Sequence, residues 1–599
     1  MGTRQTRNRR RYNQEHVRKV VQTVLMVVLV VMLCVIVGRN VALNRADTKP
    51  TTEPTPPPSD SGGVIENTDT PEELSPGPEV TDEPEPTPTP EPFEPHSVDS
   101  TAPENFLQST DIMVDGTAFE GEYEDDIGID FGYPEEYSSL PGVITFRGNN
   151  FRDSAVYGTA NITQKKFGSS WSATTGSLTA PDGAFWSGNG WTGQALIAEW
   201  PKETRQIMNM YDWAKEAETL VEVVYPSMDG YIYFYELETG KATRDSLNLG
   251  YTFKGTGTLD PRGYPLLYVG SGYNSYKGTS HVFVVSLIDF SVLYEFGAND
   301  GFAHRAWPMY DSAPLIDADT DKLIYCGENG IIYIITLGTE YDEEAGTISV
   351  NPSRAAKWRY MSNRYASTGQ YWLGFEASPV IWQSHMIVPD NGGNLICLDL
   401  NTLTVDWVQD TLDDTNCTPV LEIEDGHPYI YASTSFHMGW RSWTTADIPV
   451  WKIDAETGEI VWQTSYSCYT VEDLSGGTQG SIAVGKNNVS DLIFVPIART
   501  PNASGGKLVA LDKETGEEVW ALDTQVYSWS TPTVVYDQNG DGYILYCTTG
   551  HYLYLVDART GEILDSRNLG GLIEASPAVY GNWLVVGHRN GTIYGIELT

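Results

Sequence analysis

The stretch VWKIDAETGEIVW, residues 450–462, decides the fold. Apolar and polar side chains alternate along both of its arms, as they do in half-buried strands. In its D-x-x-T-G-E centre, the Asp can bond the amides of a turn and the Gly can adopt positive φ. The stretch is therefore predicted to form a β-hairpin whose second arm ends in Trp462.

This hairpin recurs along the chain. Close copies are LVALDKETGEEVW (508–520), LYLVDARTGEILD (553–565) and LICLDLNTLTVDW (395–407). The position of the acidic residue can be followed through eight copies, at Glu236, Ser286, Thr336, Asp399, Asp454, Asp512, Asp557 and Glu597. A spacing of roughly 40 to 63 residues is typical of a propeller array.

Each repeat supplies four strands, because a Pro-led strand such as DSAPLI and a Val-rich strand precede most copies of the hairpin. The eighth copy ends at Thr599 without its trailing strand. The segment KKFGSSWSATTG, residues 165–176, resembles that strand, with Trp171 where Trp462 stands. We predict an all-β fold over residues 140–599, an eight-bladed β-propeller of four-stranded blades, closed by this N-terminal strand.

The beginning of the chain has the pattern of a membrane anchor. Residues 20–38, VVQTVLMVVLVVMLCVIVG, are almost wholly apolar and carry no charge, and such a run can span a bilayer as one helix. Basic residues cluster before it, in residues 1–19, so the N-terminus is expected in the cytoplasm and the rest outside the cell membrane. The alternative is a cleaved signal peptide, but the apolar run is longer than such peptides have.

Two segments separate this predicted signal-anchor helix from the propeller. Residues 39–104 are rich in Pro, Thr and Glu and have almost no large apolar side chain, which predicts a disordered, semi-stiff stalk. Residues 105–139 are expected to form an irregular lead-in.

Charge and cysteine content exclude some functions. The net charge of −43 disfavours a nucleic acid partner, because an acidic surface repels phosphates. The six cysteines are scattered, with no C-x-x-C or adjacent pair, so neither a zinc site nor a disulfide framework is indicated.

Residues 510–520 read A-x-D-x-x-T-G-x-x-x-W, and with this motif the chain resembles the pyrroloquinoline-quinone-type (PQQ-like) propeller repeat family. It looks more like the non-enzymatic BamB-type scaffolds than like quinoprotein dehydrogenases. By this resemblance, a quinone cofactor would be accompanied by a disulfide between adjacent cysteines and by a calcium site, as in the quinoprotein dehydrogenases of the family. Because no Cys-Cys occurs in this sequence, pyrroloquinoline quinone is not expected as a cofactor.

One set of residues is expected to meet at a single place. It consists of the residue three before the Pro, or its equivalent, at the start of each innermost strand: Trp191, Thr256, Asp311, Glu376, Asn416, Gln479, Trp529 and Glu574. Propeller geometry should place them around one mouth of the central channel. Aromatic faces beside hydrogen-bonding groups suit sugars or peptides, although the same side chains could simply line a wet channel.

A possible calcium loop lies elsewhere. Asp537, Asn539 and Asp541 give the D-x-N-x-D-G start of such a loop, although position 12 is Thr548 rather than Glu. Asp and Asn also favour tight turns for their own sake.

These observations favour an extracytoplasmic binding or scaffold protein that presents one propeller face to an envelope protein or glycan. The alternative is an enzyme, either a quinoprotein-like oxidoreductase or a propeller that acts on polysaccharide. Fold alone does not decide between them.

Overall fold

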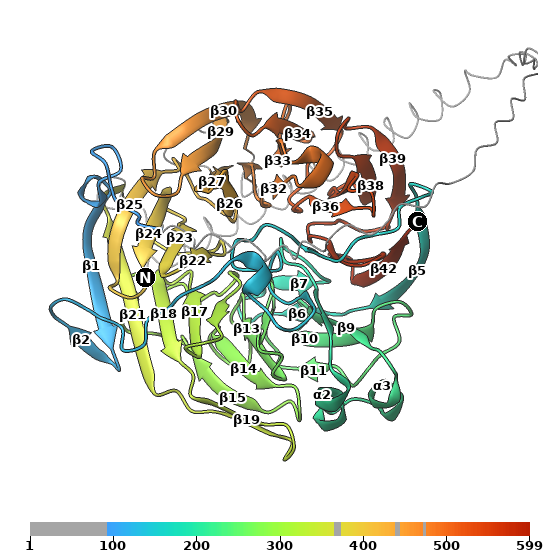
Figure 1. Cartoon of the computed structure of the whole chain (residues 1–599), viewed down its shortest axis with the longest axis horizontal. Coiled ribbons are helices and arrows are strands. Elements are labelled where there is room, and N and C mark those ends of the chain that lie inside the picture. The colour runs from blue at the N-terminus through green and yellow to red at the C-terminus, as the bar shows by residue number, and fades with distance from the viewer. Residues whose placement is uncertain (1–92, 365–372, 438–443, 471–474) are drawn as a thin grey trace, which may run out of the picture. The chain divides into compact units, whose positions relative to one another are not determined.

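Eight β-sheets of four to six strands follow one another around a ring in the computed structural model (Figure 1). The structure describes residues 93–364, 373–437, 444–470 and 475–599. The predicted tail (1–19), membrane helix (20–38) and most of the stalk lie outside these ranges. No helix in the described ranges is both long and apolar enough to span a membrane. The prediction of an eight-bladed, all-β propeller is confirmed.

Each blade is built from an innermost strand outwards to the rim of the ring. In this order, blade 1 consists of β8 (Leu196–Glu199), β9 (Val221–Pro226), β10 (Tyr231–Glu236) and β11 (Leu247–Asn248); blade 2 of β12 (Thr258–Leu259), β13 (Leu266–Gly270), β14 (Val282–Ser286) and β15 (Val292–Phe296); and blade 3 of β16 (Leu315–Asp317), β17 (Lys322–Cys326), β18 (Ile331–Thr336) and β21 (Arg354–Ser362). Blade 4 consists of β22 (Val380–Trp382), β23 (His385–Pro389), β24 (Asn394–Asp399) and β25 (Thr404–Asp410); blade 5 of β26 (Val420–Glu424), β27 (His427–Ser433), β29 (Thr445–Asp454) and β30 (Ile460–Tyr469); and blade 6 of β32 (Ala483–Val484), β33 (Leu492–Ala498), β34 (Gly506–Asp512) and β35 (Glu518–Thr524). Blade 7 consists of β36 (Thr533–Tyr536), β37 (Gly542–Cys547), β38 (Tyr552–Asp557) and β39 (Ile563–Asn568), and blade 8 of β40 (Ala578–Tyr580), β41 (Trp583–His588), β42 (Thr592–Leu598) and β5 (Phe167–Thr174).

Short elements join or connect the blades. Strand β3 (Gly142–Val143) adds to blade 1, β4 (Val156–Tyr157) to blade 8, and β28 (Ser435–Phe436) and β31 (Gly476–Gly477) to blade 6. Separate hairpins are β6 (Ser177–Thr179) with β7 (Phe185–Ser187) and β19 (Thr339–Asp342) with β20 (Thr347–Val350). The short helices are α2 (Lys202–Ile207), α3 (Asp212–Glu216), η1 (Pro103–Asn105), η2 (Pro134–Glu136) and η3 (Asn487–Val489).

The ring closes as predicted. Strand β5 pairs antiparallel with β42, with Thr174 opposite Thr592 and Ser170 opposite Ile596. The first strand of the repeat region thus completes the last blade, so blade 8 has no unpaired outer edge at β42.

Tryptophans join neighbouring blades. Trp171 on blade 8 donates its Nε1–H to the carbonyl of Leu237 on blade 1, at 2.7 Å. The same bond recurs from Trp407 to Ala455 (2.9 Å), Trp462 to Lys513 (2.9 Å) and Trp520 to Ala558 (3.1 Å). Each indole packs on the Gly of the next blade's turn. A Cβ on Gly516, for example, would lie 2.6 Å from Trp462 Cε3. The sequence motif therefore needs both its Gly and its Trp, because one blade's indole fits the next blade's turn.

An irregular segment, residues 142–160, contacts the inner strands of several blades. Its carbonyls accept hydrogen bonds from the backbone amides of Leu259, Ile381, Leu421 and Val579 on blades 2, 4, 5 and 8. Arg152 is fully buried in this segment and donates to the carbonyls of Pro379 and Ala313, both at 2.9 Å. The segment therefore ties distant blades together through polar contacts.

Two parts of the chain differ from the predicted lead-in and stalk. Residues 107–119 are not irregular: β1 (Leu107–Val114) pairs with β21 and carries β2 (Thr117–Phe119), which extends blade 3 outwards. Residues 93–104, predicted as the end of the stalk, pack on the propeller. The reason is Phe93, a large apolar side chain that stacks on Trp382 with ring centroids 4.9 Å apart.

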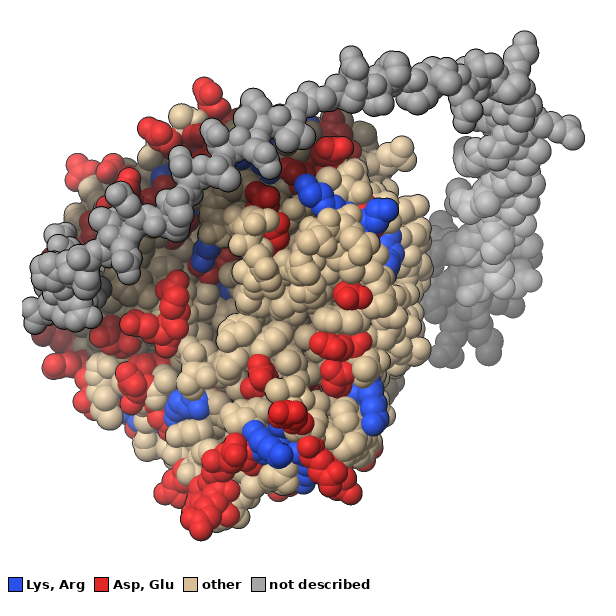
Figure 2. Space-filling view, turned by 45° about the vertical axis from the view of Figure 1, so that its right-hand side comes forward, with Lys and Arg blue, Asp and Glu red and all other residues tan. Residues whose placement is uncertain are grey.

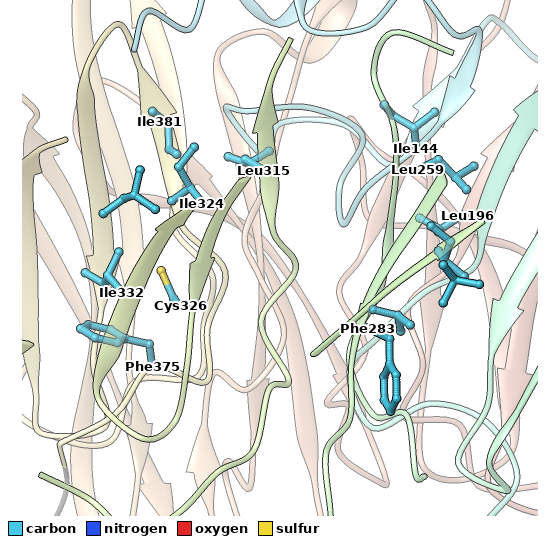
Figure 3. Close-up of a cluster of buried hydrophobic side chains, with 14 of the residues drawn as sticks. Ile144, Leu196, Leu259, Phe283, Leu315, Ile324, Cys326, Ile332, Phe375 and Ile381 are labelled. Carbon is cyan, nitrogen blue, oxygen red and sulfur yellow. The ribbon is translucent and has the colours of Figure 1, made fainter. Parts of the chain in front are cut away.

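The core lies between blades. Figure 3 shows part of its largest cluster, in which Leu315 and Ile324 of blade 3 lie near Ile381 of blade 4. The five cysteines in the described ranges are buried. They pack as small apolar side chains.

Candidate binding site at the channel mouth

Six of the eight predicted residues line one cavity. They are Trp191, Thr256, Asp311, Glu376, Asn416 and Gln479, contributed by blades 1 to 6. The cavity has a volume of about 30 Å³. A water molecule needs about 10–15 Å³ by this measure, so the space holds about two waters or one small headgroup. The other two residues lie beside the cavity. Trp529 contacts Trp191, and Glu574 pairs with Arg589, which lies over the Trp191 ring.

Trp191 reaches from blade 1 to blade 4. Its Nε1–H donates to Glu376 Oε1 at 3.3 Å. Its φ is +93°, a backbone conformation that non-glycine residues rarely adopt and that costs roughly 1–3 kcal/mol. Such strain persists only where surrounding contacts hold it, and it is common at binding sites.

Trp529 supports Trp191 from the side. Their ring centroids are 6.0 Å apart, and Trp529 is only 7% exposed. On the other side, Trp186 of β7 meets Trp191 edge to face at 6.2 Å. Trp529 is therefore placed to position the indole of Trp191, whereas Trp191 itself remains partly exposed at the mouth.

Lys254 brings a positive charge into the site. Its Nζ lies 2.9 Å from Asp311 Oδ2 and also stands over the rings of Trp186 and Trp191, 5.1 and 5.3 Å from their centroids. The pKa of Asp311 is raised to about 6, because burial and the charge of Glu376 together outweigh the opposing effect of Lys254. Burial lowers the pKa of Lys254, but the carboxylates around it raise that pKa more, so the ammonium stays charged.

Two further acidic side chains stand behind the cavity. Burial raises the pKa of Glu328 and of Asp414 well above the usual range, and the charge of Glu376 adds to both shifts. Asn391 donates to Asp414 Oδ1 at 2.7 Å and accepts from Arg305 Nη1 at 2.9 Å. With these two carboxyls added, the site holds more acidic than basic side chains.

Glu574 is paired rather than open to the cavity. Arg589 Nη1 lies 2.7 Å from Glu574 Oε2, and the guanidinium stands 5.8 Å from the centre of the Trp191 ring. Asn416 and Gln479 bond each other, from Asn416 Nδ2 to Gln479 Oε1 at 3.0 Å. The predicted ring of residues is thus a network centred on Trp191 and Glu376.

Exposed aromatic side chains belong to the loops around this mouth. Phe185, Tyr276 and Trp307 are 62%, 78% and 41% exposed. Tyr273 packs on Trp186 with ring centroids 5.0 Å apart and bonds Asp182 of the β6–β7 hairpin at 2.6 Å. Two aromatic-rich stretches of the sequence, residues 363–375 and 436–443, lie partly outside the described ranges, which omit residues 365–372 and 438–443.

Sequence reasoning missed Lys254, Arg305, Glu328, Asp414 and Arg589. Glu328 and Arg589 follow the second strand of their blades, in loops that share a face with the loops before the innermost strands. Reading those second loops as well, for example GENG at residues 327–330, would have found them.

The possible calcium residues lie away from the mouth, between β36 and β37. Asp537 Oδ1 accepts the amides of Asn539 (2.8 Å) and Asp541 (3.0 Å), so it holds the turn itself. Asn488 donates to Asp541 Oδ1 at 3.0 Å. Among the described residues, no three His, Cys, Asp or Glu side chains are grouped as metal ligands. A calcium site at this turn stays a prediction.

Acidic side chains are scattered over the visible surface, with few basic ones between them (Figure 2). This agrees with the sequence pI of about 4.4. The molecule is thus acidic over its visible surface as well as at the mouth. The carboxyls at the mouth differ from those on the surface because most of them are buried.

A family model described as outer membrane protein assembly factor BamB matches residues 344–599. The predicted PQQ-like repeat is therefore confirmed for this part of the chain. Among curated proteins, no sequence matches.

Solved structures with related folds include BamB from Moraxella catarrhalis (16% identity, 63% of this chain and 91% of that chain, TM-score 0.41). Another is quinohemoprotein alcohol dehydrogenase from Comamonas testosteroni (13% identity, 76% and 80% of the two chains, TM-score 0.47). A third is a europium-containing methanol dehydrogenase (11% identity, 76% and 98%, TM-score 0.38). Likenesses this distant bear on neither ligand nor reaction.

Proposed function

With PQQ-like repeats over residues 344–599 as the premise, we propose that this protein is a membrane-anchored, extracytoplasmic binding and scaffold protein. Its propeller presents the channel-mouth face to an envelope protein or glycan. The family model's description, an outer membrane protein assembly factor, favours a scaffold over an enzyme. The apolar run at residues 20–38, preceded by basic residues, favours the membrane anchor.

One observation carries the binding proposal. Trp191 is held at φ +93° with its indole bonded to Glu376, over a cavity lined by six residues from equivalent positions of six blades. A strained aromatic side chain at the mouth of a polar cavity suits recognition of a polar ligand.

A pull-down on peptidoglycan and on glycan resins tests this proposal. Residues 90–599, which form one compact unit, are used beside the full chain in detergent. A protein beginning at residue 105 would lose Phe93, so the earlier start is required. Binding by both proteins that disappears in Trp191→Ala, with unchanged circular dichroism, supports the proposal. No binding by either protein contradicts the glycan part and directs the search to protein partners by cross-linking in cells.

A second candidate is an enzyme that acts on polysaccharide. It is favoured by Asp311, which has a pKa of about 6 and lines the same cavity as Glu376. Loss of glycan turnover in Asp311→Asn, Glu376→Gln or Glu574→Gln would favour catalysis over binding. A quinoprotein oxidoreductase remains the less favoured form, because the sequence has no adjacent cysteines. Redox activity on adding quinone and calcium would reverse that order.

A further inference from the structure

Within the described part of the chain, no cation forms an ion pair with the carboxylate of Glu376, and the charge of Lys254 acts on it only from beyond ion-pair distance. Lys254 pairs with Asp311, and Arg305 donates to Asn391 Oδ1 and to the backbone carbonyl of Glu328. In the described ranges, no nitrogen of a Lys, Arg or His side chain lies within 4.0 Å of the Glu376 carboxylate oxygens. A half-buried carboxylate without a cation is costly, and a positively charged ligand group would relieve this cost.

Lys254 shows what kind of cation this mouth accepts. Its ammonium lies against a carboxylate, Asp311, and over two indole rings. Glu376 and Trp191 offer a ligand the same two groups, a carboxylate and an indole, in direct contact at 3.3 Å. Carboxylates attract ammonium groups by charge and indoles attract them through the ring quadrupole.

The cavity also holds a polar group without a partner. Ser481 lines it and is 1% exposed, and its Oγ has no hydrogen-bond partner in the ranges that the structure describes. A buried hydroxyl of this kind is normally bonded, so a donor or acceptor from a ligand would complete it. This observation is independent of the charge of the site.

Size and surroundings restrict the ligand further. A cavity of about 30 Å³ admits an ammonium group but not a sugar ring. The ring would stay outside, where Trp186 and Tyr273 pack on each other with ring centroids 5.0 Å apart and where Phe185 and Tyr276 are exposed. A metal ion is less suitable, since no group of three metal-ligating acidic, His or Cys side chains exists in the described ranges.

We propose that the ligand of the channel mouth is a glycan with free amino groups, whose ammonium binds at Glu376 beside Trp191 while its sugar rings stack on the surrounding aromatic side chains. This inference rests on the proposed function and adds the chemical class of the ligand.

Isothermal titration of the full chain in detergent tests it with three probes. These are a glucosamine tetrasaccharide, the corresponding N-acetylglucosamine tetrasaccharide, and tetralysine. The first two differ in N-acetylation, which removes the charge of the amino group and adds an acetyl group, and the third carries ammonium groups without sugar rings. The glucosamine tetrasaccharide should bind about tenfold more tightly than either of the others, because one charge-assisted hydrogen bond usually strengthens binding by about this factor.

Glu376→Gln should remove most of that difference. It should weaken binding of the glucosamine tetrasaccharide about tenfold and leave N-acetylglucosamine binding unchanged. The matched control is Glu514→Gln, which removes the same charge from an exposed turn between the outer strands of blade 6 and should change neither affinity. Equal circular dichroism of the variants excludes a folding defect.

The outcomes separate this inference from the function it rests on. Equal binding of the two tetrasaccharides overturns the ammonium but leaves glycan binding intact. Equal binding of tetralysine and the glucosamine tetrasaccharide overturns the sugar. If no probe binds and peptidoglycan is not retained either, both this inference and glycan binding by the mouth are wrong.

Discussion

Closure of the ring by Trp171 makes a quantitative prediction. Trp171→Ala removes the hydrogen bond to Leu237 and the ring contact with Tyr235, whose centroid is 5.6 Å away. Truncating a fully buried Trp costs about 3–5 kcal/mol, and the half-buried Trp171 should cost about 2 from packing. Adding about 1 kcal/mol for the hydrogen bond gives about 3 kcal/mol in total.

This cost should appear as local opening of β5. A loss of about 3 kcal/mol corresponds to about a 100-fold increase in the opening equilibrium. Amide hydrogen exchange of β5 should therefore be about 100-fold faster in Trp171→Ala than in the wild type. Exchange is measured by mass spectrometry on peptides that cover residues 167–174.

The matched control is Trp462→Ala. Trp462 makes the equivalent bond to Lys513 and is also half-buried, but it joins blades 5 and 6. Faster exchange should then be found in β30 and not in β5. Wild-type exchange of β5 in Trp171→Ala would refute the reasoning, because the ring would then be closed by backbone pairing alone.

Three further predictions concern Arg152, Asp406 and Trp191. Arg152→Met should lower the free energy of unfolding by about 4 kcal/mol, because it leaves several buried carbonyls without a donor; an unchanged urea midpoint would contradict this. Asp406 has a pKa of about 7, raised by burial and by Asp399, so the folded protein loses stability as pH rises from about 4 to 7. Between pH 5 and pH 8, the free energy of unfolding measured in urea should fall by about 3 kcal/mol less in Asp406→Asn than in the wild type. An equal pH dependence of the two proteins would refute the assignment. Trp191→Gly should relieve backbone strain and change the free energy of unfolding by less than about 1 kcal/mol, while abolishing ligand binding; a large loss of stability would show that the indole is structural.

The ring could be predicted because its contacts repeat. Four blades place a Trp on the Gly of the next blade's turn, so the same letters recur along the chain. Glu236, Asp454 and Asp557 mark the ends of third strands in the structure just as the repeat predicted. Strand β5 was found in the same way, because Trp171 is one of these tryptophans.

What does not repeat could not be predicted. Arg152 donates to backbone carbonyls and the segment around it accepts from backbone amides, and backbone groups have no signature in the sequence. Strand β1 pairs with β21, far along the chain, through a register that no local pattern gives, and β2 pairs with β1. At the mouth, the positions before the innermost strands were predictable, but Lys254 lies two residues before the predicted position of its blade, Thr256, and nothing in the repeat assigns it to the site.

The position of Trp191 separates binding from folding in this propeller. The tryptophans that join blades are Trp171, Trp407, Trp462 and Trp520, and each meets a Gly of the next blade. Trp191 is not one of them: it lies on the face of the loops, and its indole bonds a side chain rather than a turn carbonyl. The backbone strain at φ +93° therefore contributes nothing to blade joining. Strain that the fold does not require is retained where a side chain must be held in one place, and in this propeller that place is the contact between the indole and the carboxylate of Glu376.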